Sequence, residues 1–199
     1  MIGFLRGKVH EKLAPHVVID VNGVGYDVET PMSSFFSLPA AGEQVALRTH
    51  LVVREDAHIL YGFVTEQERA MFRSLIKVNG VGPKVALGIL SGVSVDDFCL
   101  WIGDSNVAAL VKLPGIGKKT AERLIIEMRD RLPAQTGGSA QMSATVTARQ
   151  VSPMEEAISA LVALGYKPQD AEKRARAVAS EDASSEQIIR SALQSAAKS

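Results

Sequence analysis

Residues 75–84 read LIKVNGVGPK and residues 110–119 read LVKLPGIGKK, so one short pattern occurs twice at an offset of 35 residues. Each copy places a Gly-x-Gly turn and lysines between two stretches of helical periodicity. Glycine lets a ligand come close to main-chain N–H groups, and the start of the following helix adds partial positive charge. Such a group of donors suits an anionic oxygen. The sequence therefore predicts two anion-binding hairpins, each between two helices.

Lysine is retained at equivalent positions of the two copies, Lys77 with Lys112 and Lys84 with Lys119. A single Gly-x-Gly is a weak signal, because it can serve only as a tight turn between packed helices. Two copies with retained lysines favour phosphate binding, and contacts to phosphates carry no base information. The pattern is typical of sequence-independent, salt-sensitive DNA binding by helix-hairpin-helix motifs. The cations expected to add attraction are Lys84, Lys118, Lys119 and Arg123.

A nucleotide-binding P-loop is excluded at the second copy. That loop needs a glycine five positions before its Gly-Lys-Ser/Thr, where this chain has Lys112, and a hydroxyl where it has Lys119. Residues 113–121 are also similar to the hairpin of helix-hairpin-helix DNA glycosylases, in which Lys119 would be the nucleophile. Those enzymes need an assisting aspartate further on within a folded domain, and Asp130 comes too early. We therefore expect no catalytic residue in this chain.

Composition narrows the class of protein further. Hydrophobic residues make up 46% of the 199 residues, and no apolar run approaches the ~20 residues that span a bilayer. The start of the chain has no signal-peptide layout. The lone Cys99 excludes an intramolecular disulfide and a Cys-only metal site, and the four histidines show no metal-ligand spacing. We expect a cytoplasmic protein without metal or cofactor.

The formal net charge is zero, but the charge is distributed unevenly. Residues 1–63 hold five Lys/Arg and seven Asp/Glu, whereas residues 64–133 hold ten and eight. Within residues 112–131 there are six basic and three acidic residues, so the positive excess lies around the second hairpin.

Residues 1–63 are predicted to form a β domain. Short apolar and alternating runs, separated by Pro, Gly and Asn-Gly breaks, indicate about five strands, and that number favours a small barrel of the OB type. The expected strands are Ile2–His10, His16–Val21, Val24–Glu29, Val45–Val53 and Ala57–Phe63.

From Thr65 the periodicity becomes helical through residues 64–133. Thr65 and Glu68 match a capping box, Pro83 suits the first turn of a helix, and Ser94 is expected to start another. Two apolar stripes are expected to face the core. Their members are Met71, Phe72, Leu75 and Ile76 in the first, and Ala121, Leu124, Ile125 and Met128 in the second.

Residues 134–152 have one charge and no aromatic residue, so we expect a flexible tether with a reach of about 25 Å. Residues 153–199 are predicted to form three short helices, Met154–Leu164, Gln169–Ala179 and Ser185–Ala197. The expected core residues of this small domain are Ile158, Leu161, Val162, Leu164, Val178, Ile188, Ile189 and Leu193.

The chain resembles the RuvA family over its whole length apart from the tether. These proteins are the DNA-binding subunits of the bacterial complex that moves the branch point of Holliday junctions. One departure is Phe4, where the family usually has arginine. The resemblance rests on both hairpins and on Met1–Gly3, Asn22–Tyr26, His50–Ala57, Leu60–Phe63 and Leu164–Pro168.

This resemblance implies a homotetramer, or an octamer, that holds a four-way junction open and square. It further implies recruitment of the hexameric ATPase RuvB through the C-terminal helices, and a RuvC-type resolvase as a possible further partner. The alternative that stays open is a generic helix-hairpin-helix accessory that binds duplex DNA without preferring junctions.

The resemblance also implies roles for individual residues. Glu55 and Asp56 would be an acidic pin near the crossover, although a charged pair at a hairpin break is otherwise an ordinary solvated turn. Leu161, Leu164 and Tyr166 would be part of the docking patch for the ATPase, or only part of a core. The residues that would contact DNA backbones are Asn79, Gly80, Gly82, Lys84, Gly115, Gly117, Lys118, Lys119 and Arg123.

Overall fold

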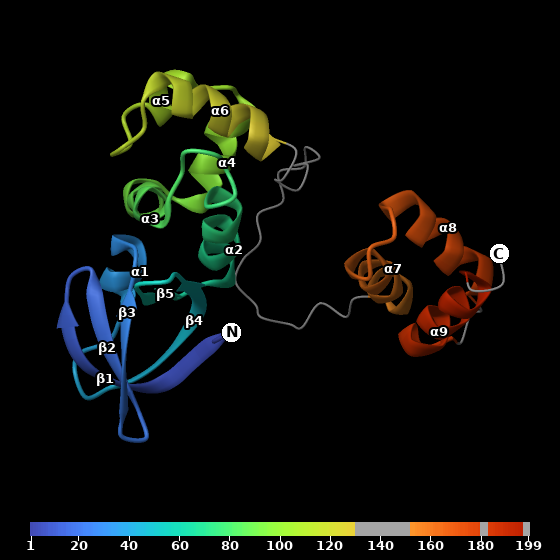
Figure 1. Cartoon of the computed structure of the whole chain (residues 1–199), viewed down its shortest axis with the longest axis horizontal. Coiled ribbons are helices and arrows are strands. Elements are labelled where there is room, and N and C mark those ends of the chain that lie inside the picture. The colour runs from blue at the N-terminus through green and yellow to red at the C-terminus, as the bar shows by residue number, and fades with distance from the viewer. Residues whose placement is uncertain (130–151, 180–182, 197–199) are drawn as a thin grey trace. The chain divides into compact units, whose positions relative to one another are not determined.

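The computed structural model describes residues 1–129, 152–179 and 183–196, and these form two separate compact units. The first unit holds all of the described residues up to 129, and the second begins at Ser152 (Figure 1). The predicted tether, residues 134–152, lies outside the described residues except for Ser152. Each unit is described by itself below.

The predicted barrel is confirmed: five strands close on one another in the order β1-β2-β3-β5-β4. Neighbouring strands are antiparallel except β3 and β5, which are parallel and pair Glu29 with Tyr61. The pairing of β1 with β4 closes the barrel. The strands are β1 (Phe4–Leu13), β2 (His16–Val21), β3 (Val24–Glu29), β4 (Gln44–Val53) and β5 (His58–Phe63).

Two features of the barrel differ from the sequence prediction. Strand β1 starts at Phe4 and continues to Leu13, and its register against β2 shifts between Val9 and Glu11. Such a bulge bends a strand, so β1 pairs with β4 in its first half and with β2 in its second. The six-residue helix α1 (Met32–Ser37), between β3 and β4, was not predicted.

Contacts with distant residues account for α1, because the helix is too short to show a helical period and no side chain caps its N-terminus. The Ser34 hydroxyl donates to the Glu68 carboxylate at 2.8 Å and accepts from the Val64 N–H at 2.8 Å. Ser33 donates to the same carboxylate at 2.6 Å. Glu68 also closes the capping box with Thr65. One carboxylate therefore joins α1 to the start of the helical domain.

The helical domain follows the predicted pattern of starts and stops. Thr65 caps α2 with both bonds of a capping box, Pro83 occupies the first turn of α3, and the Ser94 side chain caps α4. The helices are α2 (Glu66–Leu75), α3 (Pro83–Gly92), α4 (Val95–Gly103), α5 (Val107–Leu110) and α6 (Lys118–Arg129). Both predicted apolar stripes are buried, except that Ile76 is only partly so. Among the described residues no single helix is long and apolar enough to cross a membrane, and α3 with α4 meet that test only as a pair bent by 100°.

The barrel and the helices share one hydrophobic core. The completely buried ring of Phe72 on α2 lies 4.9 Å from the ring of Tyr61 and 5.0 Å from that of Phe63, centroid to centroid. Both partners belong to β5, whose side chains thus join the core of the helical domain. On the other side, the Ser91 hydroxyl of α3 accepts from the Met32 N–H of α1 at 2.9 Å. The two domains of the first unit are therefore held together as one body.

The second unit is a bundle of α7 (Pro153–Ala163), α8 (Pro168–Val178) and α9 (Ser185–Ala196). Its three helices agree with the prediction, and six of the eight expected core residues lie in or against its core, which is richer in alanine than expected. Val162 and Leu164, which were predicted to be core residues, are 38% and 62% exposed. Short alanine side chains let the helices approach one another closely. The fully buried residues are Ala157, Leu161, Ala171, Ala175, Ile188 and Ala192.

His50 on β4 lies against α2, where the Arg73 Nε donates to its Nδ1 at 3.3 Å and its ring meets Phe72 edge-on. Burial, followed by the charges of Arg73 and Arg69, lowers the pKa of His50 below its ordinary 6.5. As pH falls below about 6.5, the unfolded chain therefore takes up the proton first, and the free energy of unfolding decreases.

We expect an NMR titration of the His50 ring to give a pKa below 6.5. His50→Gln, which keeps an acceptor for Arg73 but cannot titrate, should lose less stability than the unsubstituted protein between pH ~7 and ~5 in denaturant unfolding. A His50 pKa at or above 6.5, or equal losses in the two proteins, would contradict this prediction.

Candidate nucleic-acid interface

The two glycine hairpins have the same backbone. The main-chain hydrogen bonds of the first copy occur again in the second copy, between residues 35 positions further on. The repeated backbone confirms that the sequence pattern reflects a structural repeat. The equivalent N–H to O bonds are 77→74 and 112→109, 78→75 and 113→110, 81→78 and 116→113, and 86→82 and 121→117.

The glycines of each hairpin are needed for two different reasons. Gly80 and Gly115 have φ values of +88° and +77°, in the left-handed region that disfavours side chains. Gly82 has an ordinary φ of −84°, and a Cβ built on it or on Gly117 would meet nothing within 4 Å. Nothing inside the described chain therefore requires glycine at 82 and 117, which fits a ligand that comes close from outside.

The glycine N–H groups of both hairpins are free to bind such a ligand. Among the described residues, those of Gly80, Gly82, Gly115 and Gly117 donate no hydrogen bond. The residue between the glycines anchors each turn, since Val81 and Ile116 are buried. Each hairpin therefore presents unpaired donors on a rigid support, at the start of α3 or α6, where the helix dipole also favours an anion.

The predicted lysines surround these donors. Lys84 lies in the first turn of α3, and Lys118 and Lys119 begin α6. All three are exposed and form no ion pair within the described residues. Their charge is therefore available to an external anion.

Contacts between the two copies bring the hairpins side by side. The Arg123 guanidinium on α6 donates from Nη1 to the Asn79 carbonyl of the first hairpin at 3.0 Å. In the other direction, a Cβ on Gly115 of the second hairpin would lie 3.6 Å from Val85 Cγ2 on α3. All nine residues predicted to contact DNA thus lie on two adjacent hairpins or on the helices that follow them.

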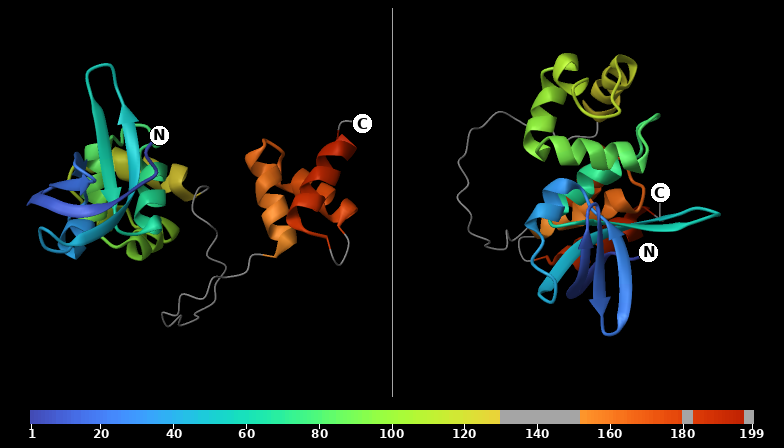
Figure 2. Two further views of the ribbon diagram at one scale, coloured as in Figure 1. Left: turned by 90° about the horizontal axis from the view of Figure 1, so that it is seen from below. Right: turned by 90° about the vertical axis from the view of Figure 1, so that its left-hand side faces the viewer.

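The predicted pin residues, Glu55 and Asp56, lie elsewhere, at the tip of the hairpin between β4 and β5. The last strand pair joins Val53 to His58, and the Arg54 N–H donates to the Ala57 carbonyl at 2.8 Å to close the turn. Figure 2 shows this hairpin projecting beyond the rest of the barrel. Both carboxylates are exposed and form no ion pair within the described residues.

The three residues proposed for docking in the second unit differ in their exposure. Leu161 is completely buried in the core, which fits the core role that the sequence left open for it. Leu164 is 62% exposed, and Tyr166 is partly buried with the Arg174 guanidinium 5.6 Å from its ring centroid. Of these three residues, Leu164 and Tyr166 reach the surface of the unit.

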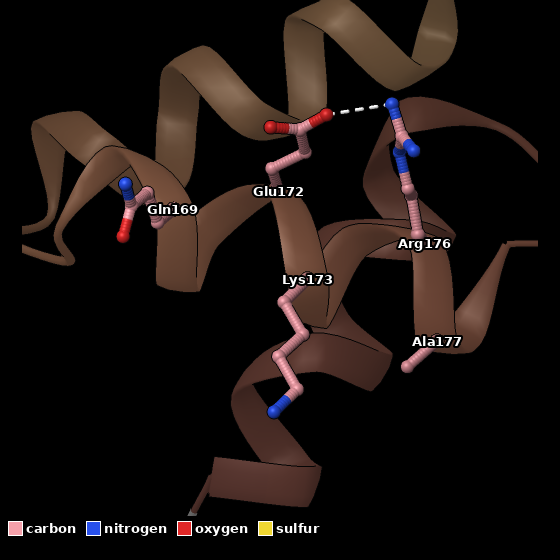
Figure 3. A pocket seen from close by; sticks show the side chains of 5 residues that line it. All are labelled: Gln169, Glu172, Lys173, Arg176 and Ala177. Carbon is pink, nitrogen blue, oxygen red and sulfur yellow. Dashed lines mark ion pairs between the residues drawn. The ribbon is translucent and has the colours of Figure 1, made fainter.

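Helix α8 has a charged face that the sequence prediction did not single out. A shallow hollow there is lined by Gln169, Glu172, Lys173, Arg176 and Ala177, and Glu172 pairs with Arg176 at 2.6 Å (Figure 3). The i,i+4 spacing of this pair was the available signal, although such pairs are common on solvated helix faces. No group of three or more His, Cys, Asp or Glu side chains that could hold a metal occurs among the described residues.

A small closed barrel followed by two adjacent hairpins with free amides defines a tandem helix-hairpin-helix protein. Three family models match the chain. "RuvA N terminal domain" covers residues 1–62, "SAM-like Helix-hairpin-helix tandem" covers residues 72–130, and "RuvA, C-terminal domain" covers residues 152–197. Together with the relatives described next, these matches show that the chain belongs to the RuvA family.

Several curated relatives are similar over essentially the full length of both chains. A protein of Thioalkalivibrio sulfidiphilus and one of Methylococcus capsulatus are each 54% identical, with complete coverage of both chains. A protein of Pseudomonas paraeruginosa is 52% identical over 97% of this chain and 98% of its own. All three are named "Holliday junction branch migration complex subunit RuvA".

The two kinds of hairpin glycine should respond differently to substitution. Gly80→Ala strains a left-handed residue and should lower the free energy of unfolding by about 1–2 kcal/mol. Gly82→Ala should change that free energy by less than about 1 kcal/mol, because the space around it is open. Its methyl group should nevertheless weaken DNA binding about tenfold by holding phosphates away from the amides.

Denaturant unfolding and fluorescence anisotropy with labelled DNA measure these two effects. Gly103→Ala is a matched control, since its Cβ would also meet open space and it lies at the end of α4, outside both hairpins. Unchanged DNA affinity in Gly82→Ala would contradict the assignment of the free amides to phosphate binding.

Proposed function

We propose that this chain binds four-way DNA junctions through their sugar-phosphate backbones and acts as the junction-binding subunit of a branch-migration complex. The observation that carries the proposal is the pair of adjacent hairpins, each with two main-chain N–H groups that have no acceptor in the described chain. Full-length similarity to subunits named for the Holliday junction supports the same function.

The backbone mode of binding suits branch migration. Amides and lysines at the hairpins recognise phosphates, which are the same at every base pair. A protein that moves a branch point must tolerate every sequence that passes through it. Contacts of this kind hold DNA without locking it at one sequence.

The acidic pin supplies the preference for junctions in this proposal. The carboxylates of Glu55 and Asp56 repel phosphates, so the tip of the β4–β5 hairpin disfavours a continuous duplex beneath it. At a crossover the strands diverge, and the tip can occupy the space between them. The shared core of Tyr61, Phe63 and Phe72 supports this role, because it holds the pin's hairpin on the same body as the DNA-binding hairpins.

The assembly and partners follow from the family's role. We place four copies, or eight, around the junction, so that each copy holds one arm and the pins meet at the centre. The chain supplies no nucleotide-binding loop and no catalytic residue in this proposal, and the hexameric ATPase RuvB supplies the energy in the cytoplasm. Leu164 and Tyr166 in the second unit are the residues proposed to meet the ATPase, and a RuvC-type resolvase is a further proposed partner.

Binding to an immobile four-way junction and to a linear duplex of matched length tests the function. We expect the junction to bind at least tenfold more tightly at moderate salt, and junctions of different sequence to bind alike. Lys119→Ala should weaken binding to all sequences equally and lower the slope of log affinity against log salt by about 0.9.

Lys173→Ala, which removes an exposed charge from the second unit, is the matched control and should leave affinity and slope unchanged. Equal affinity for junction and duplex would favour the alternative of a generic duplex-binding accessory. A sequence-selective loss in Lys119→Ala would contradict backbone binding.

The repulsive role proposed for Glu55 and Asp56 can be tested separately. The double variant Glu55→Gln, Asp56→Asn removes the repulsion without changing side-chain shape, so duplex affinity should stay the same or rise while the junction-to-duplex ratio falls. The double variant Glu156→Gln, Asp170→Asn removes two exposed carboxylates from the second unit and should change neither quantity. Weaker binding of the pin variant to every form of DNA would show that the carboxylates do not act by repulsion.

A further inference from the structure

The hydrogen bond from Arg123 to Asn79 joins the two repeats across 44 residues of sequence. Arg123 projects from α6, in the second motif, and its Nη1 reaches the Asn79 carbonyl of the first hairpin at 3.0 Å. This is the arginine's one hydrogen bond among the described residues, and the side chain is otherwise exposed. A built Cβ on Gly80 would lie 3.7 Å from the same Nη1 atom. The guanidinium therefore rests against the peptide unit between Asn79 and Gly80.

The second hairpin has an equivalent contact, made with α3 of the first motif. At the offset of 35 residues, Asn79 corresponds to Pro114 and Arg123 corresponds to Gly88. Gly88 on α3 faces Pro114, since a Cβ at position 88 would lie 3.3 Å from the proline Cγ. In each direction, the helix after one hairpin contacts the same position of the other hairpin.

The bond to the Asn79 carbonyl also fixes where the Gly80 N–H points. The carbonyl and the N–H of one trans peptide unit lie on opposite sides of the chain. Because the Asn79 carbonyl faces Arg123 on α6, the Gly80 N–H faces away from α6. This N–H is one of the glycine donors that have no acceptor in the described chain.

The two hairpins restrict this peptide in different ways. In the second hairpin the Pro114 ring fixes the φ of residue 114, and its packing over Gly88 holds the residue that precedes the equivalent peptide. In the first hairpin Asn79 has no such ring, and Gly80, at φ +88°, is conformationally permissive. A hydrogen bond from outside the hairpin is what restricts the first peptide.

We propose that Arg123 is a positioning residue that orients the Asn79–Gly80 peptide, so that the Gly80 N–H is held ready for a DNA phosphate. The proposal rests on the proposed function for the identity of the ligand. It assigns Arg123 an action through the first hairpin, in place of the direct backbone contact that the family resemblance implies.

The orientation of the Asn79–Gly80 peptide can be tested without DNA by NMR, on the full chain labelled with ¹⁵N at its 16 glycines. We expect Arg123→Ala to change the chemical shift of the Gly80 amide and to lower its ¹H–¹⁵N heteronuclear NOE. The Gly115 amide signal should stay in place. Lys119→Ala, which removes a neighbouring charge but does not touch Asn79, should leave the Gly80 signal unchanged. A Gly80 signal that is the same with and without Arg123 overturns the proposal.

DNA binding then separates positioning from loss of charge. Arg123→Ala should weaken junction binding roughly five- to tenfold, the order of one exposed hydrogen bond, with little change in the salt slope. Lys119→Ala should lower that slope by about 0.9. If the slope falls as much in Arg123→Ala as in Lys119→Ala, loss of charge alone explains the weaker binding and the positioning role is wrong.

A rescue variant applies the geometry of the second hairpin to the first. Asn79→Pro combined with Arg123→Gly rebuilds the pair formed by Pro114 and Gly88, and the Asn79 N–H that is lost donates no hydrogen bond in the described chain. We expect the double variant to bind junctions more tightly than Arg123→Gly alone. A double variant that binds no better than the single one contradicts the proposal. Failure of the proposed function itself would be distinguishable, because the unsubstituted chain would then show no preference for junctions while the Gly80 signal still responded to Arg123.

Discussion

The proposed DNA-binding surface of this protein depends on main-chain N–H groups that stay unpaired, and fixed in direction, on two hairpins. An unpaired amide costs little while water can reach it, but it becomes a strong donor only if its direction is fixed. Val81 and Ile116 fix each hairpin from below by being buried in the helical core. Glycine above them leaves the outer face open. The hydrophobic core of the helices is thus what makes the donors usable.

The same core links the donors to the barrel. The ring of Phe72 lies between the helices and the side chains of Tyr61 and Phe63 on β5. Glu68 adds a polar link, since its carboxylate accepts from two serines of α1 while it caps α2. Strand β5 is also one arm of the hairpin that carries Glu55 and Asp56, the proposed acidic pin. The attraction proposed at the glycine hairpins and the repulsion proposed at the pin would therefore come from one body.

Zero net charge is compatible with this arrangement because the opposing charges are separated in space. Lysines lie at the starts of α3 and α6, where the helix dipoles add to their effect. The exposed carboxylates of Glu55 and Asp56 lie at the tip of a different element. A uniformly basic protein would hold any duplex equally, whereas separated charges can distinguish the arms of a junction from its centre.

Local features of the sequence were sufficient to predict most helices and strands of the fold. Strand alternation, the Thr65 capping box, Pro83 and the repeat of residues 75–84 each act within a few neighbouring residues, so they could be interpreted without the structure. Helix α1 could not, because serines in it are held by Glu68 more than 30 residues away. Nor could the alanine core of the second unit, where close approach of the helices leaves Val162 and Leu164 outside.

The candidate site, too, could be predicted from the sequence only in part. The sequence by itself determined which residues form the hairpins and that two equivalent hairpins exist, because a glycine turn followed by a helix start is a local pattern. Only the tertiary structure decided that the hairpins lie side by side and that Arg123 reaches Asn79. Residues 44 positions apart meet because of how the helices pack around the buried core, and packing of that kind leaves no periodic signal along the chain.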